Sequence, residues 1–158
     1  MEFISLLTLK PVLVGLHLGF AIIGIDAFLW LLGEIVANAQ SFARRRATAL
    51  IGIGGFLLSW IIGGYYYVVY YGTVVKPEIK AGLAPWIHSI VMETKEHVFL
   101  FLLPLALTAF FLTLLNKEAF EDLKVKPLSV LLALLIVGIG LAIGAMGFMI
   151  SAAARWGS

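Results

Sequence analysis

Apolar residues run along this chain in four long stretches that short polar segments separate. The stretches cover about residues 11–36, 47–71, 86–115 and 128–154. Each is long enough to cross a bilayer, because a spanning helix needs about 20 mostly apolar residues. Helices joined by short loops run antiparallel, and the loops leave no room for another domain. The pattern predicts an all-α protein, an integral membrane four-helix up-down-up-down bundle in which residues 1–158 form a single transmembrane domain.

The composition supports this class and excludes several kinds of site. Hydrophobic residues make up 62% of the 158 residues and charged residues only 13%, whereas a soluble domain is roughly half apolar and about a quarter charged. The surplus apolar surface predicts contact with the lipid bilayer. Cysteine is absent, which excludes thiolate ligands, iron–sulfur clusters and haem attached through a C-x-x-C-H motif. The net charge of +2 is too small to indicate binding to nucleic acid.

The distribution of basic residues predicts the orientation in the membrane. Arg44, Arg45 and Arg46 directly follow the first apolar stretch, and such clusters stay on the cytoplasmic side. Both termini and the second loop then lie outside, which is the periplasm for a bacterial inner membrane protein. The tyrosines within residues 65–71, together with Trp86, suit the aromatic belt at the outer interface.

Two histidines are the main candidates for a functional site. His17 lies near the start of the first stretch, and His97 directly precedes the apolar core of the third. The first and third helices of such a bundle begin on the same side, so the two imidazoles are expected at similar depth on diagonal helices. Ionisable residues at membrane depth are costly and mark working sites by default. We therefore expect His17 and His97 to be the axial ligands of a haem iron.

Three further residues belong to this candidate site. Gly24 lies seven residues after His17 on the same helical face, where it lets a flat macrocycle approach the backbone. Glu93 lies four residues before His97, so it orients that ring, acts as a carboxylate ligand itself, or is a solvated charge on a helix extension that reaches out of the membrane. His88 falls on roughly the opposite face from His97. We expect it to be an interfacial residue, with a role as an alternative ligand if the helix breaks.

Other polar and small residues have structural as well as functional interpretations. Asp26 is expected near mid-membrane, as a proton-relay carboxyl or a hydrogen-bonded lock to another helix. Glu34 is expected to pair with the arginine triplet, and Lys95 and Glu96 to be solvated. Stripes of small residues favour close helix packing over a widened cavity. They consist of Thr48, Gly52, Gly55, Ser59 and Gly63 in the second stretch and Gly140, Gly144, Gly147 and Ser151 in the fourth.

The order of signals in the first half of the chain resembles that of a known family. An early histidine precedes a tryptophan and a glycine, an arginine-rich loop and a glycine-rich second span, here His17, Trp30, Gly33, Trp60, Gly63 and Gly64. This order resembles small membrane proteins of the copper-resistance CopD type and related small membrane cytochromes b, over about half of the chain. The resemblance implies a component that handles haem or metal. The segment from Glu93 to His97 departs from the pattern.

Three functions follow from these observations. The first is a membrane protein with haem b that carries electrons between a periplasmic partner, such as a cytochrome, and a quinone or larger membrane complex. The second is a non-haem site in which His17, Glu93 and His97 bind copper, zinc or iron. The third is a structural accessory subunit, alone or as a homo-oligomer, whose histidines hydrogen-bond across helices. An electron-transfer protein or a subunit is favoured over a stand-alone enzyme.

Overall fold

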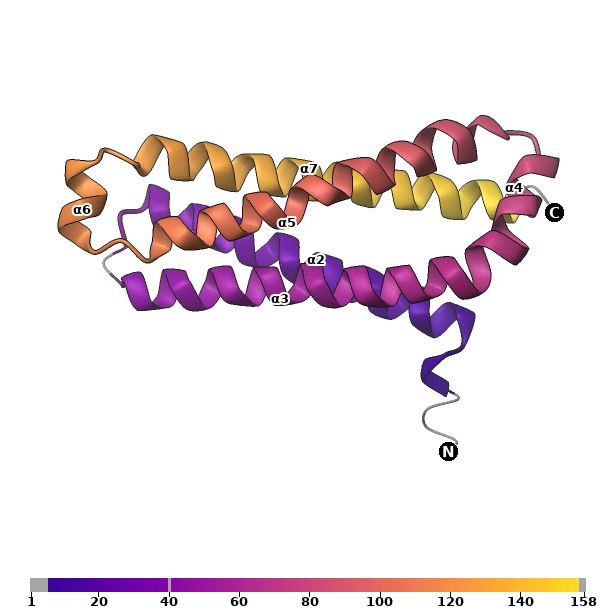
Figure 1. Ribbon diagram of the computed structural model, residues 1–158, viewed down its shortest axis with the longest axis horizontal. Coiled ribbons are helices and arrows are strands. Elements are labelled where there is room, and N and C mark those ends of the chain that lie inside the picture. The colour runs from indigo at the N-terminus through magenta and orange to yellow at the C-terminus, as the bar shows by residue number, and fades with distance from the viewer. Residues whose placement is uncertain (1–5, 40, 157–158) are drawn as a thin grey trace.

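The computed structural model describes residues 6–39 and 41–156, and these residues form helices and turns without a strand. Four long helices lie side by side along the longest axis of the molecule (Figure 1). They are α2 (Lys10–Val36), α3 (Phe42–Tyr66), α5 (Glu93–Thr113) and α7 (Lys126–Trp156). The shorter elements are η1 (Tyr67–Val75), α4 (Lys76–Ala81), η2 (Ile87–Met92) and α6 (Lys117–Asp122). The predicted all-α class is confirmed.

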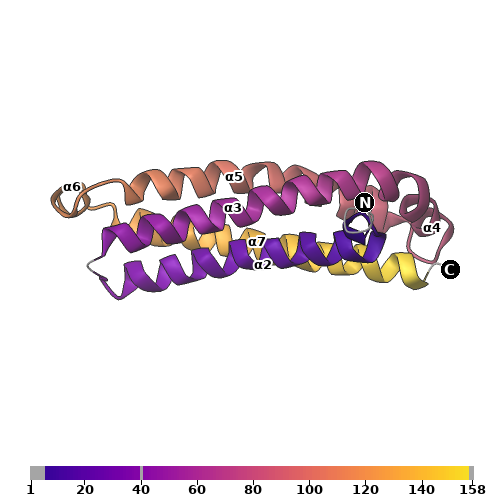
Figure 2. The same cartoon turned by 90° about the horizontal axis from the view of Figure 1, so that it is seen from below.

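The long helices form a bundle with two distinct ends. Successive long helices run in opposite directions in Figure 1, and α2 and α5 each pack against both α3 and α7. The start of α2, the helix α4 and the end of α7 gather at one end, which we call the α4 end (Figure 2). The helix α6 and the turn between α2 and α3 lie at the other, which we call the α6 end.

Four helical segments are long and apolar enough to cross a membrane: Lys10–Val36, Phe42–Ala81, Ile87–Thr113 and Lys126–Arg155. In the first and third segments only 22% of the most apolar window is buried inside the protein. Most of their apolar side chains therefore face outward, where water would solvate them poorly. These four candidate spans suggest a membrane protein.

The second helical segment is longer than the sequence pattern indicates. It begins at Phe42 instead of residue 47, because the Ser41 side chain caps the helix by accepting a hydrogen bond from the Arg44 amide. Arginine is a good helix former, so the triplet extends the helix instead of forming a loop. At its other end the segment passes through the π-helical η1 and continues to Ala81, ten residues beyond the expected end at residue 71.

The interface between α2 and α3 is closely packed because glycines let the two helices approach. A Cβ atom added at Gly55 would lie 2.7 Å from the backbone nitrogen of Gly24, and one added at Gly52 would lie 2.6 Å from the ring of Phe28. The Phe28 and Phe56 rings stack with their centroids 5.8 Å apart. Both rings belong to a buried apolar cluster built from all four long helices. Close packing is therefore the correct interpretation of the small-residue stripe at these positions.

The α6 end is held by the arginine triplet. Glu34 is buried and forms an ion pair with Arg44, which confirms the predicted pairing. Arg45 is also buried and donates to the backbone oxygens of Glu34 and Ala39, at 3.3 and 2.8 Å. Its guanidinium lies 4.7 Å from the ring centroid of Phe42, a cation–π distance. Arg44 and Arg45 thus tie the start of α3 to the end of α2, and Arg46 donates to the backbone oxygens of Thr113 and Leu114 at the end of α5.

Candidate functional site

His17 forms a polar contact between two long helices, α2 and α3. Its Nδ1 atom lies 2.8 Å from the backbone oxygen and 2.9 Å from the hydroxyl oxygen of Ser59 on α3. The Ser59 hydroxyl donates in return to the His17 backbone oxygen at 2.9 Å. Because the Ser59 carbonyl can only accept, these bonds assign the ring proton to Nδ1. The half-buried imidazole therefore connects α2 to α3, and in the neutral ring the free lone pair belongs to Nε2.

Gly63 makes room for this imidazole. A Cβ atom at Gly63 would lie 2.6 Å from Nδ1 and 2.8 Å from Cε1 of His17. Gly64, the next residue, points elsewhere, and a Cβ atom there would meet nothing within 4 Å. The ring is therefore seated against the bare backbone of α3, one helical turn beyond its hydrogen-bond partner Ser59.

Lys95 differs from the solvated residue that the sequence pattern indicates. It is half-buried on α5, and its Nζ atom would lie 3.4 Å from a Cβ atom added at Gly147 on α7. The ammonium group therefore points towards α7 and into the bundle, an orientation that the sequence pattern did not predict. The opening that Gly147 leaves on α7 was the available signal.

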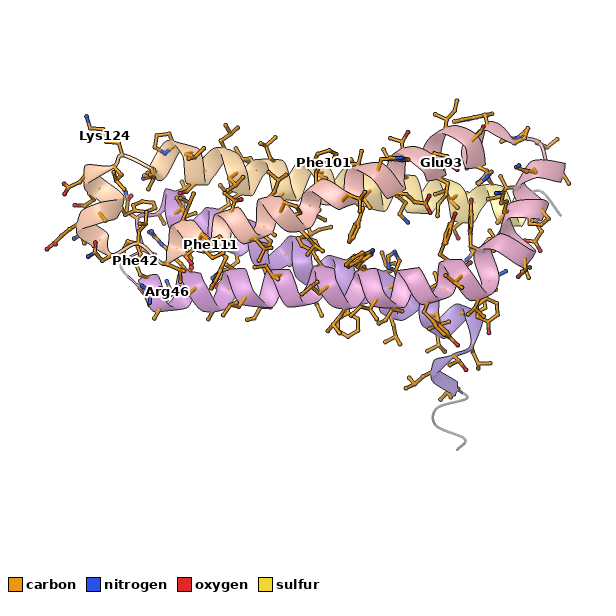
Figure 3. The ribbon with its side chains drawn as sticks, in the orientation of Figure 1. Phe42, Arg46, Glu93, Phe101, Phe111 and Lys124 are labelled. Atoms are coloured by element: carbon orange, nitrogen blue, oxygen red, sulfur yellow. The ribbon has the colours of Figure 1, made fainter. Side chains whose placement is uncertain are left out.

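The structure does not bring His97 to His17. His97 is exposed, and its Nδ1 atom lies 2.6 Å from the backbone oxygen of Glu93 in the preceding turn. Glu93, which is labelled in Figure 3, is exposed as well. Residues two apart on an α-helix point about 200° away from each other, so an inward Lys95 places His97 outward. The expectation that His17 and His97 ligate one haem iron together therefore stays a prediction, and in the described structure each ring bonds to a different helix.

Gly24 contacts an aromatic ring instead of open space. It is buried on the face of α2 that packs against α3. A Cβ atom there would lie 2.5 Å from two ring carbons of Phe56. The phenyl ring thus occupies the space in which the sequence interpretation places a macrocycle. The described structure uses Gly24 for packing between α2 and α3.

His88 is buried inside the protein, and its expected position at the membrane interface stays a prediction. Only 4% of its surface is exposed, and its Nδ1 atom lies 3.0 Å from the hydroxyl oxygen of Tyr71. Tyr71 is 1% exposed and stacks on Tyr67 at 5.1 Å between centroids. The expected face of His88 assumed α-helical spacing, but residues 87–92 are π-helical, which changes the angle between successive side chains. This pair ties η1 to η2 at the α4 end.

The described residues contain no group of three or more histidine, aspartate or glutamate side chains placed to hold a metal ion. Known proteins add no further guide, since no family model, curated protein or solved structure matches the chain. The function therefore has to be inferred from the arrangement of its own side chains.

Proposed function

We propose that this chain is an integral membrane protein that acts as an accessory subunit of a membrane assembly. The observation that carries the proposal is the use of both inward-facing histidines as links between helical segments. His17 bonds to Ser59, and His88 bonds to Tyr71. Within a membrane, side chains that hydrogen-bond across helices hold a bundle together where water is absent. In this proposal the histidines stabilise the fold, and the outer surface serves the assembly.

The proposed topology is an up-down-up-down bundle in a bacterial inner membrane with both termini in the periplasm. The alternating helix directions in Figure 1 support it, as does the gathering of Arg44, Arg45 and Arg46 at the α6 end. Alkaline phosphatase is active only outside and green fluorescent protein fluoresces well only inside. A C-terminal fusion should therefore give phosphatase activity, and a fusion inserted within α6 should fluoresce. The opposite result at both sites would contradict the orientation.

The accessory function is tested with variants of His17 and His97, the two histidines to which the haem hypothesis gives the same role as iron ligands. We expect His17→Ala to lower the resistance of the purified protein to unfolding, since it removes the bonds to Ser59. We expect His97→Ala to leave stability nearly unchanged, because that ring is exposed and bonds only to its own helix. A haem or metal that copurifies with the wild-type protein and is lost from both variants would contradict the proposal.

A second candidate function is a haem b or metal protein, and one observation favours it. A histidine that ligates a metal usually donates its other ring N–H to a carbonyl or carboxylate. The Nδ1 atom of His17 is bonded in this way to Ser59, which leaves Nε2 available for a haem iron, copper, zinc or non-haem iron. Bound haem would supply one-electron chemistry towards a periplasmic cytochrome or a quinone. Metal analysis together with a reduced-minus-oxidised spectrum distinguishes haem from bare metal and from neither.

A further inference from the structure

The outward face of α2 carries glycines along its whole length. A Cβ atom added at Gly15, Gly19 or Gly33 would meet nothing within 4 Å. With 3.6 residues per turn, these glycines and Asp26 fall within about 20° of one line along the helix. All four residues are exposed, and the opposite face of α2 packs against α3 and α7. This stripe, Gly15–Gly19–Asp26–Gly33, is therefore a surface on which another backbone can approach closely.

Asp26 is the residue of this stripe whose polar side chain is poorly solvated by lipid. It is the seventeenth residue of the 27 in α2, close to the middle of the span. Its side chain is exposed, and it makes no hydrogen bond or ion pair with any residue that the structure describes. Carboxyl groups at this depth almost always face protein or a water-filled cavity, because hydrocarbon offers them no partner. The exposed carboxyl therefore favours contact with a polar group at the same depth on another protein surface.

We propose that two copies of this chain associate through the Gly15–Gly19–Asp26–Gly33 stripe, with the two Asp26 side chains meeting at the interface. The proposal rests on the proposed location in the membrane. A two-fold axis along the membrane normal keeps every residue at its own depth, so a second copy brings a carboxyl to the level of the first. A protonated carboxyl donates to an oxygen of its neighbour, and the pair needs no other partner.

The glycines explain how the two copies come close enough for this contact. Gly15 and Gly19 form a small-xxx-small pair, which lets two membrane helices approach at their backbones. Ile22 is exposed on the same side, between Gly19 and Asp26, and provides apolar surface for the contact. The exposed groups thus combine close approach with one polar contact near mid-membrane.

Disulfide cross-linking of single-cysteine variants tests the interface in the membrane, since the natural chain has no cysteine. Gly19→Cys places a thiol on the stripe, and Gly64→Cys is the matched control. Both glycines are exposed with open space at the Cβ position, but Gly64 lies on α3. On mild oxidation we expect Gly19→Cys to give a covalent dimer of twice the chain mass. We expect Gly64→Cys to stay monomeric.

The role of Asp26 is tested on the Gly19→Cys background. Asp26→Leu should lower the dimer-to-monomer ratio about three- to twenty-fold, the range that interhelical hydrogen bonds in membranes produce. Asp26→Asn should retain the dimer, because two amides also bond reciprocally. Equal cross-linking of the Asp26→Leu and parent proteins, no dimer in the parent, or a product with a different protein would each overturn the inference. Release of the chain from membranes by alkaline carbonate would instead contradict the proposed function.

Discussion

The substitution Gly63→Ala tests whether His17 is held between α2 and α3 as described. The new methyl group would lie 2.6 Å from Nδ1 of the imidazole, and the ring must move by about 0.8 Å to restore a contact of 3.4 Å. That movement stretches the 2.8 Å bond to the Ser59 backbone oxygen beyond the usual range. The substitution thus acts on the His17–Ser59 contact without changing either of the two bonded residues.

Three terms set the expected magnitude. Losing an interhelical hydrogen bond in a membrane costs about 0.6 to 1.7 kcal/mol. The new methyl group overpacks the space that the His17 imidazole occupies, which adds a cost of about 1–3 kcal/mol. Alanine recovers up to about 1 kcal/mol through its higher helix propensity. We therefore expect Gly63→Ala to lower the free energy of unfolding by about 1–5 kcal/mol. Gly64→Ala has open space around its Cβ position and should change stability by about 0–1 kcal/mol in the stabilising direction.

The assay is unfolding of the purified protein in mixed micelles by increasing SDS, followed by far-ultraviolet circular dichroism. Combining Gly63→Ala with Ser59→Ala completes a double-mutant cycle. The combined effect should be smaller than the sum of the single effects, because both changes weaken the same contact. Equal stability of the Gly63→Ala and Gly64→Ala proteins, or strict additivity with Ser59→Ala, would refute the arrangement of His17.

Three other substitutions test the remaining contacts by the same unfolding assay. Gly55→Ala should destabilise the protein by about 1–3 kcal/mol, because its Cβ atom would meet the backbone of α2, which cannot rotate away. Gly54→Ala has open space around its Cβ position and should not destabilise it. Equal stability of the two variants would contradict the α2–α3 packing. Arg45→Met should cost about 1–3 kcal/mol through lost hydrogen bonds and cation–π contacts, and a neutral effect would argue against its burial. Tyr71→Phe should cost about 1–2 kcal/mol by leaving buried His88 without its hydroxyl partner, and an unchanged midpoint would show that this bond contributes little.

The sequence predicted the parts of the fold that depend on length and on local charge. Four apolar stretches gave four long helices, because crossing length and apolar composition are visible without knowledge of packing. The pairing of Glu34 with the arginine triplet was predictable because the residues flank one short turn. Packing at Gly52 and Gly55 followed from the spacing of small residues on one helical face.

The inward face of α5 was not predictable in the same way. Helical spacing gives the angle between two side chains, but it does not say which of them points inward. The apolar core of α5 has hydrophobic residues on all sides, so its pattern does not distinguish a lipid face from a protein face. In the structure Lys95 points inward and His97 points outward. The π-helical segment that precedes them also changes the angle at which the His88 side chain leaves the helix.

The position of Gly24 illustrates a second limit. Its spacing from His17 correctly places the two residues on one side of α2, and both contact α3. The sequence does not reveal that the Phe56 ring fills the space above Gly24, because that depends on the register between α2 and α3. The interpretation of a glycine as open space for a ligand therefore needs the neighbouring helix.

In the proposed function, His17 links two helices of an accessory membrane subunit instead of holding a haem. The most direct measurement is the reduced-minus-oxidised absorption spectrum of the full chain, purified from cells with ample haem. We expect wild-type protein to show no haem bands and yet to unfold cooperatively in SDS, as a folded protein does. A reducible b-type spectrum that disappears in the His17→Ala variant would contradict the proposed function.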